Sequence, residues 1–239
     1  MDCGRTPCKK KQEIYKPYIL ESFFYADEVT ERLLPYFGDF MLDSGAFTFM
    51  SGNGGKMPWE EYVDRYSEFI KRNKIEKFFE LDIDSITGYE KTKELRKRLE
   101  RNLTKQPIPV WHKNRGIDEW YKMADEYSYI ALGGIAIKEI KKDQYKAFPA
   151  MIREAHKRNA KVHGLGFTNL SLLPIYHFDS VDSTAWTTGN RFGYLYYFDG
   201  KTMRKKDAPK GYKLGDSRAA ALNNYTEWIK FQKYAENNL

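Results

Sequence analysis

The sequence predicts a single α/β domain of the TIM-type (β/α)8 barrel class across residues 1–239. Three observations predict it. From residue 18 onward, short apolar runs alternate with longer segments of helical period, as in repeated strand–helix units around a parallel sheet. Several of these runs end in aspartate or glycine, and a chain of 239 residues suits one barrel-sized domain.

Seven apolar runs are expected to form the strands. They are Tyr18–Tyr25, Phe40–Asp43, Lys77–Ile83, Ile108–His112, Tyr129–Gly133, Lys161–Leu165 and Phe178–Asp182. Seven strands are one short of a closed eight-stranded barrel. Either the polar leader at residues 1–17 or the run Phe192–Phe198 supplies the eighth strand, or the barrel is incomplete with an altered first or last strand.

Helices are expected between the strands and at the end of the chain. The segments are Pro58–Asn73, Tyr89–Leu103, Ile117–Tyr127, Lys138–Asn159 and Ser217–Asn237. Pro58 suits the start of a helix because its missing N–H costs nothing there, and Glu60 and Glu61 suit the positive end of the helix dipole. Residues 187–239 thus combine a basic and aromatic segment with a final helix that has a broad apolar stripe.

The composition indicates an anionic partner and a cytoplasmic setting. The formal net charge is +7 and the isoelectric point is near 9.1. No stretch reaches the roughly 18 apolar residues of a membrane span, and the leader has no apolar core of a secretory signal. Cys3 and Cys8 have no nearby histidine to complete a four-ligand zinc site, so neither a metal nor another cofactor is expected.

Six segments place polar residues or glycines where the predicted strands end. They are LDSGAF (42–47), LDIDS (81–85), PVWHK (109–113), ALGGIA (131–136), HGLGF (163–167) and VDST (181–184). The carboxyl ends of parallel strands open on one face, so these segments should converge on one pocket. Several carboxylates at the ends of buried strands are more often functional than structural, which singles out Asp43, Asp82 and Asp182.

Each carboxylate also has a structural interpretation. Asp43 could cap the turn that follows it. Asp82 and Asp84 are expected on opposite faces of a strand. One can then face the pocket, while the other caps a turn or supports a side chain of the site. The same choice exists between Asp179 and Asp182.

The glycines, histidines and basic residues leave similar alternatives. Gly133 and Gly134 indicate either a tight turn or a close approach of backbone N–H groups to a ligand. His112 and His163 could equally be satisfied core groups. Lys201–Lys213 is rich in lysine and arginine and follows an aromatic run, which suits phosphate contact and base stacking but also suits a solvated loop.

In order and spacing these segments resemble the tRNA-guanine transglycosylase (queuine tRNA-ribosyltransferase) superfamily, and within it the short phage-type relatives that insert 7-deazaguanines into DNA. LDSGAF is similar to the family's D-S-G-G-F/Y motif, LDIDS to its F-D-E, and PVWHK to the strand that carries V-Q-G. ALGGIA is similar to A-V-G-G-L-A, HGLGF to H-x-L-M-G-V-G, and FDSVDST to M-F-D-C-V. The similarity spans roughly residues 18–186.

The resemblance implies a double displacement. A carboxylate attacks C1′ of a guanosine, guanine leaves, and a 7-deazaguanine (preQ0-like) base takes its place, by the logic of retaining glycosidases. The nucleophile is then Asp182, with Asp179 as the alternative because FDSV and VDST both align. Asp43 becomes the general acid/base.

The resemblance also implies how the base and the polymer are held. Asp82 accepts hydrogen bonds from the donor edge of the base, and Phe47 stacks on the ring. The remaining base-binding residues are Ser44, His112, Leu165 and the backbone of Gly133 and Gly134. The residues expected on the nucleic-acid backbone are Lys201, Arg204, Lys205, Lys206 and Lys210. The target nucleotide is flipped out of the duplex or presented single-stranded.

Departures from the family pattern favour DNA as the polymer. The tRNA-modifying members have a zinc site of three cysteines and a histidine after the nucleophile strand, whereas no Cys or His follows Asp182 here. His112 replaces the family's glutamine and Ala46 its second glycine, which suggests a different deazaguanine. A phage-encoded enzyme would act in the host cytoplasm. The alternatives are a tRNA enzyme without zinc, a non-catalytic nucleic-acid-binding paralogue and a barrel hydrolase that acts on a small glycoside.

Overall fold

A computed structural model describes residues 15–45, 48, 58–167, 169–192, 194–207 and 217–239. The leader up to residue 14, with Cys3 and Cys8, lies outside the described residues, as do Ala46, Phe47 and Lys210. Predictions for these residues therefore stay predictions.

Seven parallel strands follow one another in chain order. The first sheet contains β1 (Tyr18–Ser22), β2 (Asp39–Asp43) and β3 (Lys77–Phe78). The second contains β4 (Val110–Trp111), β5 (Tyr129–Leu132), β6 (Lys161–Gly164) and β7 (Ser180–Val181). A parallel bridge between Phe79 and Ile108 links the two sheets. The α/β class with parallel strands is therefore confirmed, and each of the seven predicted runs contains a strand.

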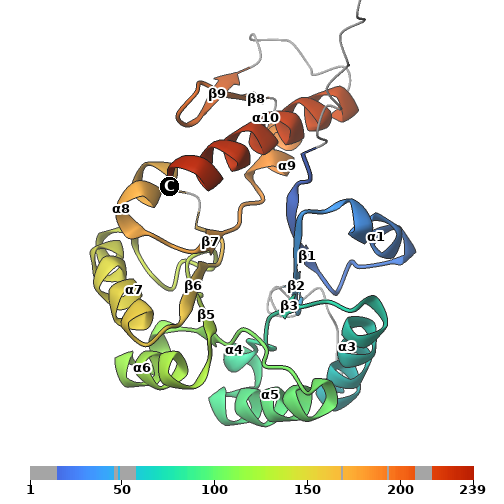
Figure 1. The fold of residues 1–239 in the computed structure, drawn as a ribbon, viewed down its shortest axis with the longest axis vertical. Helices are drawn as coiled ribbons and strands as arrows, with labels where there is room; N and C mark the ends of the chain where they lie inside the picture. The colour runs from blue at the N-terminus through green and yellow to red at the C-terminus, as the bar shows by residue number, and fades with distance from the viewer. Residues whose placement is uncertain (1–14, 46–47, 49–57, 168, 193, 208–216) are drawn as a thin grey trace, which may run out of the picture.

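Helices alternate with the strands and lie outside them (Figure 1). The longer ones are α1 (Glu28–Leu33), α3 (Trp59–Asn73), α5 (Tyr89–Leu103), α6 (Ile117–Glu126) and α7 (Phe148–Lys157). The shorter ones are η1 (Leu34–Tyr36), α4 (Asp84–Thr87), η2 (Lys113–Arg115), η3 (Lys142–Ala147), η4 (Leu170–Leu172) and α8 (Leu173–Tyr176). The helix predicted at Lys138–Asn159 is divided into η3 and α7, because Pro149 lies in the first turn of α7, where its missing N–H is tolerated.

The strands bury side chains on both faces. On β2, Leu42 packs with the helices α3 and α5, whereas Met41 points the other way into a small inner cluster. On β5, Ile130 and Leu132 pack outward, and Ala131 joins the same inner cluster. The inner cluster consists of Met41, Phe79, Ile108, Val110 and Ala131. Because side chains alternate along a strand, Asp43, two residues after Met41, also points to the inner face, beyond the inner cluster.

The chain after β7 does not supply an eighth barrel strand. It forms α9 (Ala185–Phe192), the antiparallel hairpin of β8 (Tyr194–Phe198) and β9 (Met203–Asp207), and α10 (Ser217–Asn238). Of the three alternatives for the eighth strand, Phe192–Phe198 is therefore excluded, whereas most of the leader lies outside the described residues. The cause is local, because Asp199 and Gly200 form a tight turn in which the Asp199 carboxylate accepts the N–H groups of Lys201 and Thr202.

Helix α10 lies across the gap between β7 and β1 (Figure 1). Phe231 belongs to the core cluster built around α6 and α7. The next residue is Gln232, whose side chain accepts the N–H of Tyr18 at the start of β1, at 3.0 Å. Among the described strands none pairs with both β7 and β1, so a closed barrel is not formed by strand pairing there. No helix in these described parts has the length and apolarity to cross a membrane.

Candidate active site

Polar side chains and glycines collect where successive parallel strands end. Asp43 ends β2, Asp82 follows β3, and Asp182 comes directly after β7. His112 follows β4, Gly133 follows β5 and Leu165 follows β6. The negative charges of Asp82 and Asp182 both raise the pKa of Asp43, so each of these two carboxylates lies near Asp43. The structure thus brings together the three acids that the sequence singled out.

Asp43 occupies a turn that requires glycine. Its Oδ2 accepts the N–H of Gly45 at 2.9 Å, so the capping interpretation is correct as far as it goes. Burial first, then the charge of Asp82, raises the pKa of Asp43 to about 7, against the hydrogen bonds from the backbone. Gly45 has φ of +84°, and a Cβ there would lie 2.9 Å from Cβ of Phe24. A carboxyl group with this pKa can both donate and accept a proton near neutral pH.

Two tyrosines of α3 hold the backbone around Asp43. The Tyr62 hydroxyl donates to the carbonyl of Ser44 at 2.6 Å, and the Tyr66 hydroxyl donates to the carbonyl of Leu42 at 2.9 Å. Ser44 itself is fully buried, and its hydroxyl has no hydrogen-bond partner among the described residues. The side chain of Ser44 therefore offers no exposed surface to a base, contrary to its predicted role.

Asp82 forms one end of a carboxylate–imidazole–carboxylate row. His112 Nε2 lies 3.2 Å from Asp82 Oδ2, and His112 Nδ1 lies 3.0 Å from Glu139 Oε2. Burial lowers the pKa of His112, but the hydrogen bond and charge of Asp82, followed by the hydrogen bond to Glu139, raise it to about 9. His112 is therefore an imidazolium at neutral pH, held between two acids.

Glu139 is a member of the site that the sequence analysis missed. It lies within the predicted helix Lys138–Asn159, where a glutamate suggests an exposed helix surface. Instead it lies in the connection between β5 and η3, and its Oε1 also accepts the N–H of Asn114 at 3.1 Å. Its position a few residues after the G-G pair is the only local signal that could have indicated a role.

The two glycines at positions 133 and 134 make room for this row. A Cβ on Gly133 would lie 2.7 Å from Val110 Cγ1 and 3.1 Å from His112 Cε1, and a Cβ on Gly134 would lie 2.7 Å from Glu139 Oε2. The N–H of Gly133 donates to the Trp111 carbonyl at 2.9 Å, so it is not available to a ligand as the sequence analysis expected. Gly134 has φ of +79°, which agrees with the tight-turn interpretation.

Asp182 is held by one of its two oxygens. Oδ1 accepts the N–H of Gly166 at 2.6 Å and lies 3.3 Å from His163 Nε2. Oδ2 has no partner among the described residues. Leu165, predicted to line the base, is half-buried and packs on the inner apolar cluster below the strand ends.

Asp179 and Asp84 lie elsewhere and have structural partners. Asp179 Oδ2 accepts the N–H of Val162 at 2.8 Å and contacts His156 Nε2 at 2.8 Å, which places it at the amino end of β6, away from Asp182. Asp84 forms a buried, two-point ion pair with Arg115, at 2.6 and 2.7 Å. Asp84 is therefore the supporting member of the LDIDS segment.

Four of the five predicted nucleic-acid contacts lie on the β8–β9 hairpin, and the fifth, Lys210, lies outside the described residues. Lys205 lies over the ring of Tyr194, 4.3 Å from its centroid, and Arg204 pairs with Asp199 at 2.6 Å. Lys206 and Lys201 are exposed. An open groove of about 520 Å³ is lined by Leu195, Tyr196, Tyr197, Lys205, Lys206 and Asn223. The basic segment is thus partly a strand with ordered aromatic neighbours, and not only a solvated loop.

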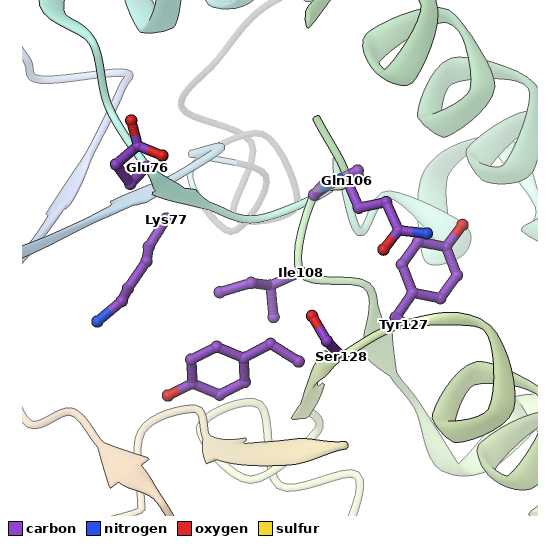
Figure 2. A pocket seen from close by; sticks show the side chains of 8 residues that line it. Glu76, Lys77, Gln106, Ile108, Tyr127 and Ser128 are labelled. Atoms are coloured by element: carbon purple, nitrogen blue, oxygen red, sulfur yellow. The ribbon is translucent and has the colours of Figure 1, made fainter. Parts of the chain in front are cut away.

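A cavity smaller than the groove lies at the amino ends of the parallel strands, opposite the ends that carry Asp43, Asp82 and Asp182. It has a volume of about 140 Å³ and is bordered by residues at the amino ends of β3, β4 and β5 (Figure 2). Glu76, Lys77, Gln106 and Ile108 line one part of it, and Tyr127, Ser128 and Tyr129 line another. Within the described ranges no three His, Cys, Asp or Glu side chains are grouped as metal ligands.

The sequence matches no model of a known protein family and no curated protein.

Proposed function

We propose that this protein is a nucleic-acid base transglycosylase, which exchanges guanine for a preQ0-like 7-deazaguanine in DNA through a covalent aspartyl–sugar intermediate. The observation that carries the proposal is the convergence of Asp43, Asp82 and Asp182 at the ends of three parallel strands, close enough to perturb the pKa of Asp43. The order of the six strand-end segments, which resembles that of the transglycosylases, supports it.

In the first step, Asp182 Oδ2 attacks C1′ of the target guanosine. The bond between C1′ and N9 breaks, its electron pair leaves with guanine, and the protonated Asp43 gives its proton to the departing base. An ester bond between Asp182 and the sugar results. Support for Asp182 comes from its Oδ2, which has no partner in the part of the chain that the structure describes, whereas both contacts of Asp179 hold it at the other end of the strands.

In the second step, the entering base reverses these changes. Asp43, now a carboxylate, takes the proton from N9 of the 7-deazaguanine, N9 attacks C1′, and the ester bond breaks to free Asp182. A group that gives and then takes a proton works best when its pKa lies near the working pH. The pKa of Asp43 at about 7 meets this requirement.

Recognition of the base is assigned to Asp82 and His112. His112 contacts only Oδ2 of Asp82, which leaves Oδ1 to accept hydrogen bonds from the donor edge of a guanine-like base. The charged His112 forms an ion pair with Asp82 in a partly buried position. An unpaired carboxylate there would lower the stability of the fold.

The β8–β9 hairpin is assigned to the polymer. Its lysines and tyrosines share one groove, in which Tyr197 is exposed and Tyr196 is buried, so phosphate contact is combined with an aromatic surface for stacking. We expect DNA on this surface, in single-stranded form or with the target nucleotide flipped out.

The test is incorporation of labelled guanine or preQ0 into duplex DNA, single-stranded DNA and tRNA. Asp182→Asn should abolish incorporation into DNA, and Asp179→Asn, the same change three residues away at the other end of β7, should retain it. Wild-type enzyme stopped during turnover should carry the sugar covalently, whereas Asp182→Asn should not. Incorporation into tRNA alone would establish the tRNA enzyme instead. No incorporation into any polymer would overturn the proposal in favour of a binding paralogue or a glycoside hydrolase.

A further inference from the structure

A chain of partly buried hydrogen bonds runs down the inner face of the parallel strands from Asp182. His163 Nε2 lies 3.3 Å from Asp182 Oδ1, and His163 Nδ1 bonds to the hydroxyl of Ser180. The Ser180 hydroxyl in turn lies 2.6 Å from the hydroxyl of Tyr129. The four residues come from β5, β6, β7 and the end of β7, so three neighbouring strands contribute to one chain.

Strand register and packing bring these groups together. Ala131, His163 and Ser180 are direct neighbours across β5, β6 and β7. Only 1% of the His163 surface is exposed, and its ring packs on Phe79 with the ring centroids 5.2 Å apart. The packing fixes the plane of the imidazole, so only its two nitrogens are left for polar contacts.

One direction of the chain satisfies every donor. Tyr129 donates to Ser180, Ser180 donates to Nδ1 of His163, and Nε2–H of His163 donates to the Asp182 carboxylate. Burial raises the pKa of Tyr129 to about 12, so its hydroxyl keeps a proton to donate. A doubly protonated His163 would donate Nδ1–H to Ser180, and the proton of either Ser180 or Tyr129 would then have no acceptor among the described residues.

We propose that His163 is the positioning residue of Asp182, held in its Nε2–H tautomer by Ser180 and Tyr129. With Nε2–H and the N–H of Gly166 both on Oδ1, the carboxylate cannot rotate, and Oδ2 is the oxygen presented to the substrate. A nucleophile that is already aligned loses little conformational entropy on the way to the transition state, so the activation free energy is lower. The role of Asp182 rests on the proposed function, whereas the tautomer of His163 does not.

The first experiment reads the tautomer without any activity. Nitrogen-15 NMR of the imidazole rings distinguishes a protonated from an unprotonated ring nitrogen, and the chain has only four histidines. The His163 signals are assigned by their loss in His163→Gln. We expect wild type to show Nε2–H with Nδ1 unprotonated, Ser180→Ala to show a mixture of tautomers, and Ser180→Thr, which keeps the hydroxyl, to match wild type. A protonated Nδ1 in wild type, or a Ser180→Ala spectrum identical to wild type, would overturn the inference.

The second experiment reads the consequence for the nucleophile. Ser180→Ala should slow formation of the covalent intermediate by about 10- to 100-fold through misalignment. Binding of the free base should change little, because Asp82 and His112 are untouched, and Ser180→Thr should restore the rate. Tyr129→Phe should have a smaller effect in the same direction. Tyr129 also lines the cavity of Figure 2.

The two experiments separate the two proposals. If wild type forms no covalent intermediate on any polymer, the proposed function fails, and the NMR result still decides on the His163 tautomer. If wild type is active and Ser180→Ala reacts at the wild-type rate, the proposed function stands and the positioning role of His163 is refuted.

Discussion

Asp43 shows how a few neighbours decide the chemistry of one side chain. Burial and two nearby carboxylates favour its neutral form, whereas the N–H groups of its own turn favour the charged form. Burial and the carboxylates outweigh the N–H groups and raise the pKa of Asp43 to about 7. An acid of this kind costs stability when it is ionised in the folded protein, and this cost can be measured.

The stability of the protein should therefore depend on pH through Asp43. Because its pKa is higher in the folded than in the unfolded chain, the folded state binds more protons, and stability falls as the pH rises from about 4 to about 7. Asp43→Asn should remove this dependence and raise the free energy of unfolding at pH 8 by on the order of 1–2 kcal/mol relative to wild type. Urea denaturation at pH 4 and pH 8 measures both effects.

The matched control is Asp207→Asn at the exposed end of β9. Its difference from wild type should be nearly the same at the two pH values. If Asp43→Asn behaved in the same way as this control, Asp43 would not be the perturbed acid of the site.

At the scale of elements, the β8–β9 hairpin is the part of the fold best suited to a polyanion. Arg204 of the hairpin forms an ion pair with Asp199, and Lys205 lies over the ring of Tyr194. Lys206 is exposed, lines the groove and has no acidic partner among the described residues. Lys206 is therefore the residue whose charge is most available to a phosphate.

Lys206→Gln should weaken DNA binding and reduce its dependence on salt. Each phosphate contact that is lost lowers the slope of log affinity against log salt by about one unit. Fluorescence anisotropy at a series of salt concentrations gives this slope. Lys71→Gln, on the exposed end of α3, removes the same charge away from the hairpin and should leave the slope unchanged. Equal slopes for both variants and wild type would indicate that the hairpin does not contact DNA.

At the scale of the whole molecule, a helix occupies the place where a closed barrel would have its last strand. Helix α10 packs its aromatic residues against β8 and the core around α6 and α7, and it also holds the start of β1 through Gln232. The two edges of the parallel array are thus connected by side chains of one helix. This arrangement makes α10 an integral part of the described fold.

Removal of one aromatic anchor should accordingly destabilise the entire fold. Phe231 is only 6% exposed. Phe231→Ala should lower the free energy of unfolding by about 3 kcal/mol, because removal of a large buried side chain leaves a cavity. Leu222→Ala, on the same helix but 66% exposed, should have a much smaller effect. Urea denaturation followed by circular dichroism measures both. Equal effects, or a separate transition for α10, would show that the helix is not integral to the core.

Much of the fold was predictable because its signals are local. The alternation of apolar runs and helical segments depends on neighbouring residues, and all seven predicted strands contain a parallel strand. The source of the eighth strand was left open, and one alternative, Phe192–Phe198, is excluded because Tyr194–Phe198 forms a hairpin, for which the Asp199–Gly200 pair is itself a signal. The division of the helix at Lys138–Asn159 could also have been read from Pro149.

The site was predictable only in part. That Asp43, Asp82 and Asp182 would meet followed from their places at strand ends, because parallel strands present these ends on one face. The sequence by itself thus determined a parallel α/β array with three acids where its strands end. The tertiary structure alone decided that Asp182 and not Asp179 joins Asp43, that Glu139 and Asp82 enclose His112, that His163 reaches Asp182, and that α10 bridges the open edge. The physical reason is that each of these outcomes depends on contacts between side chains from distant segments, and neither local period nor residue type encodes which of them meet.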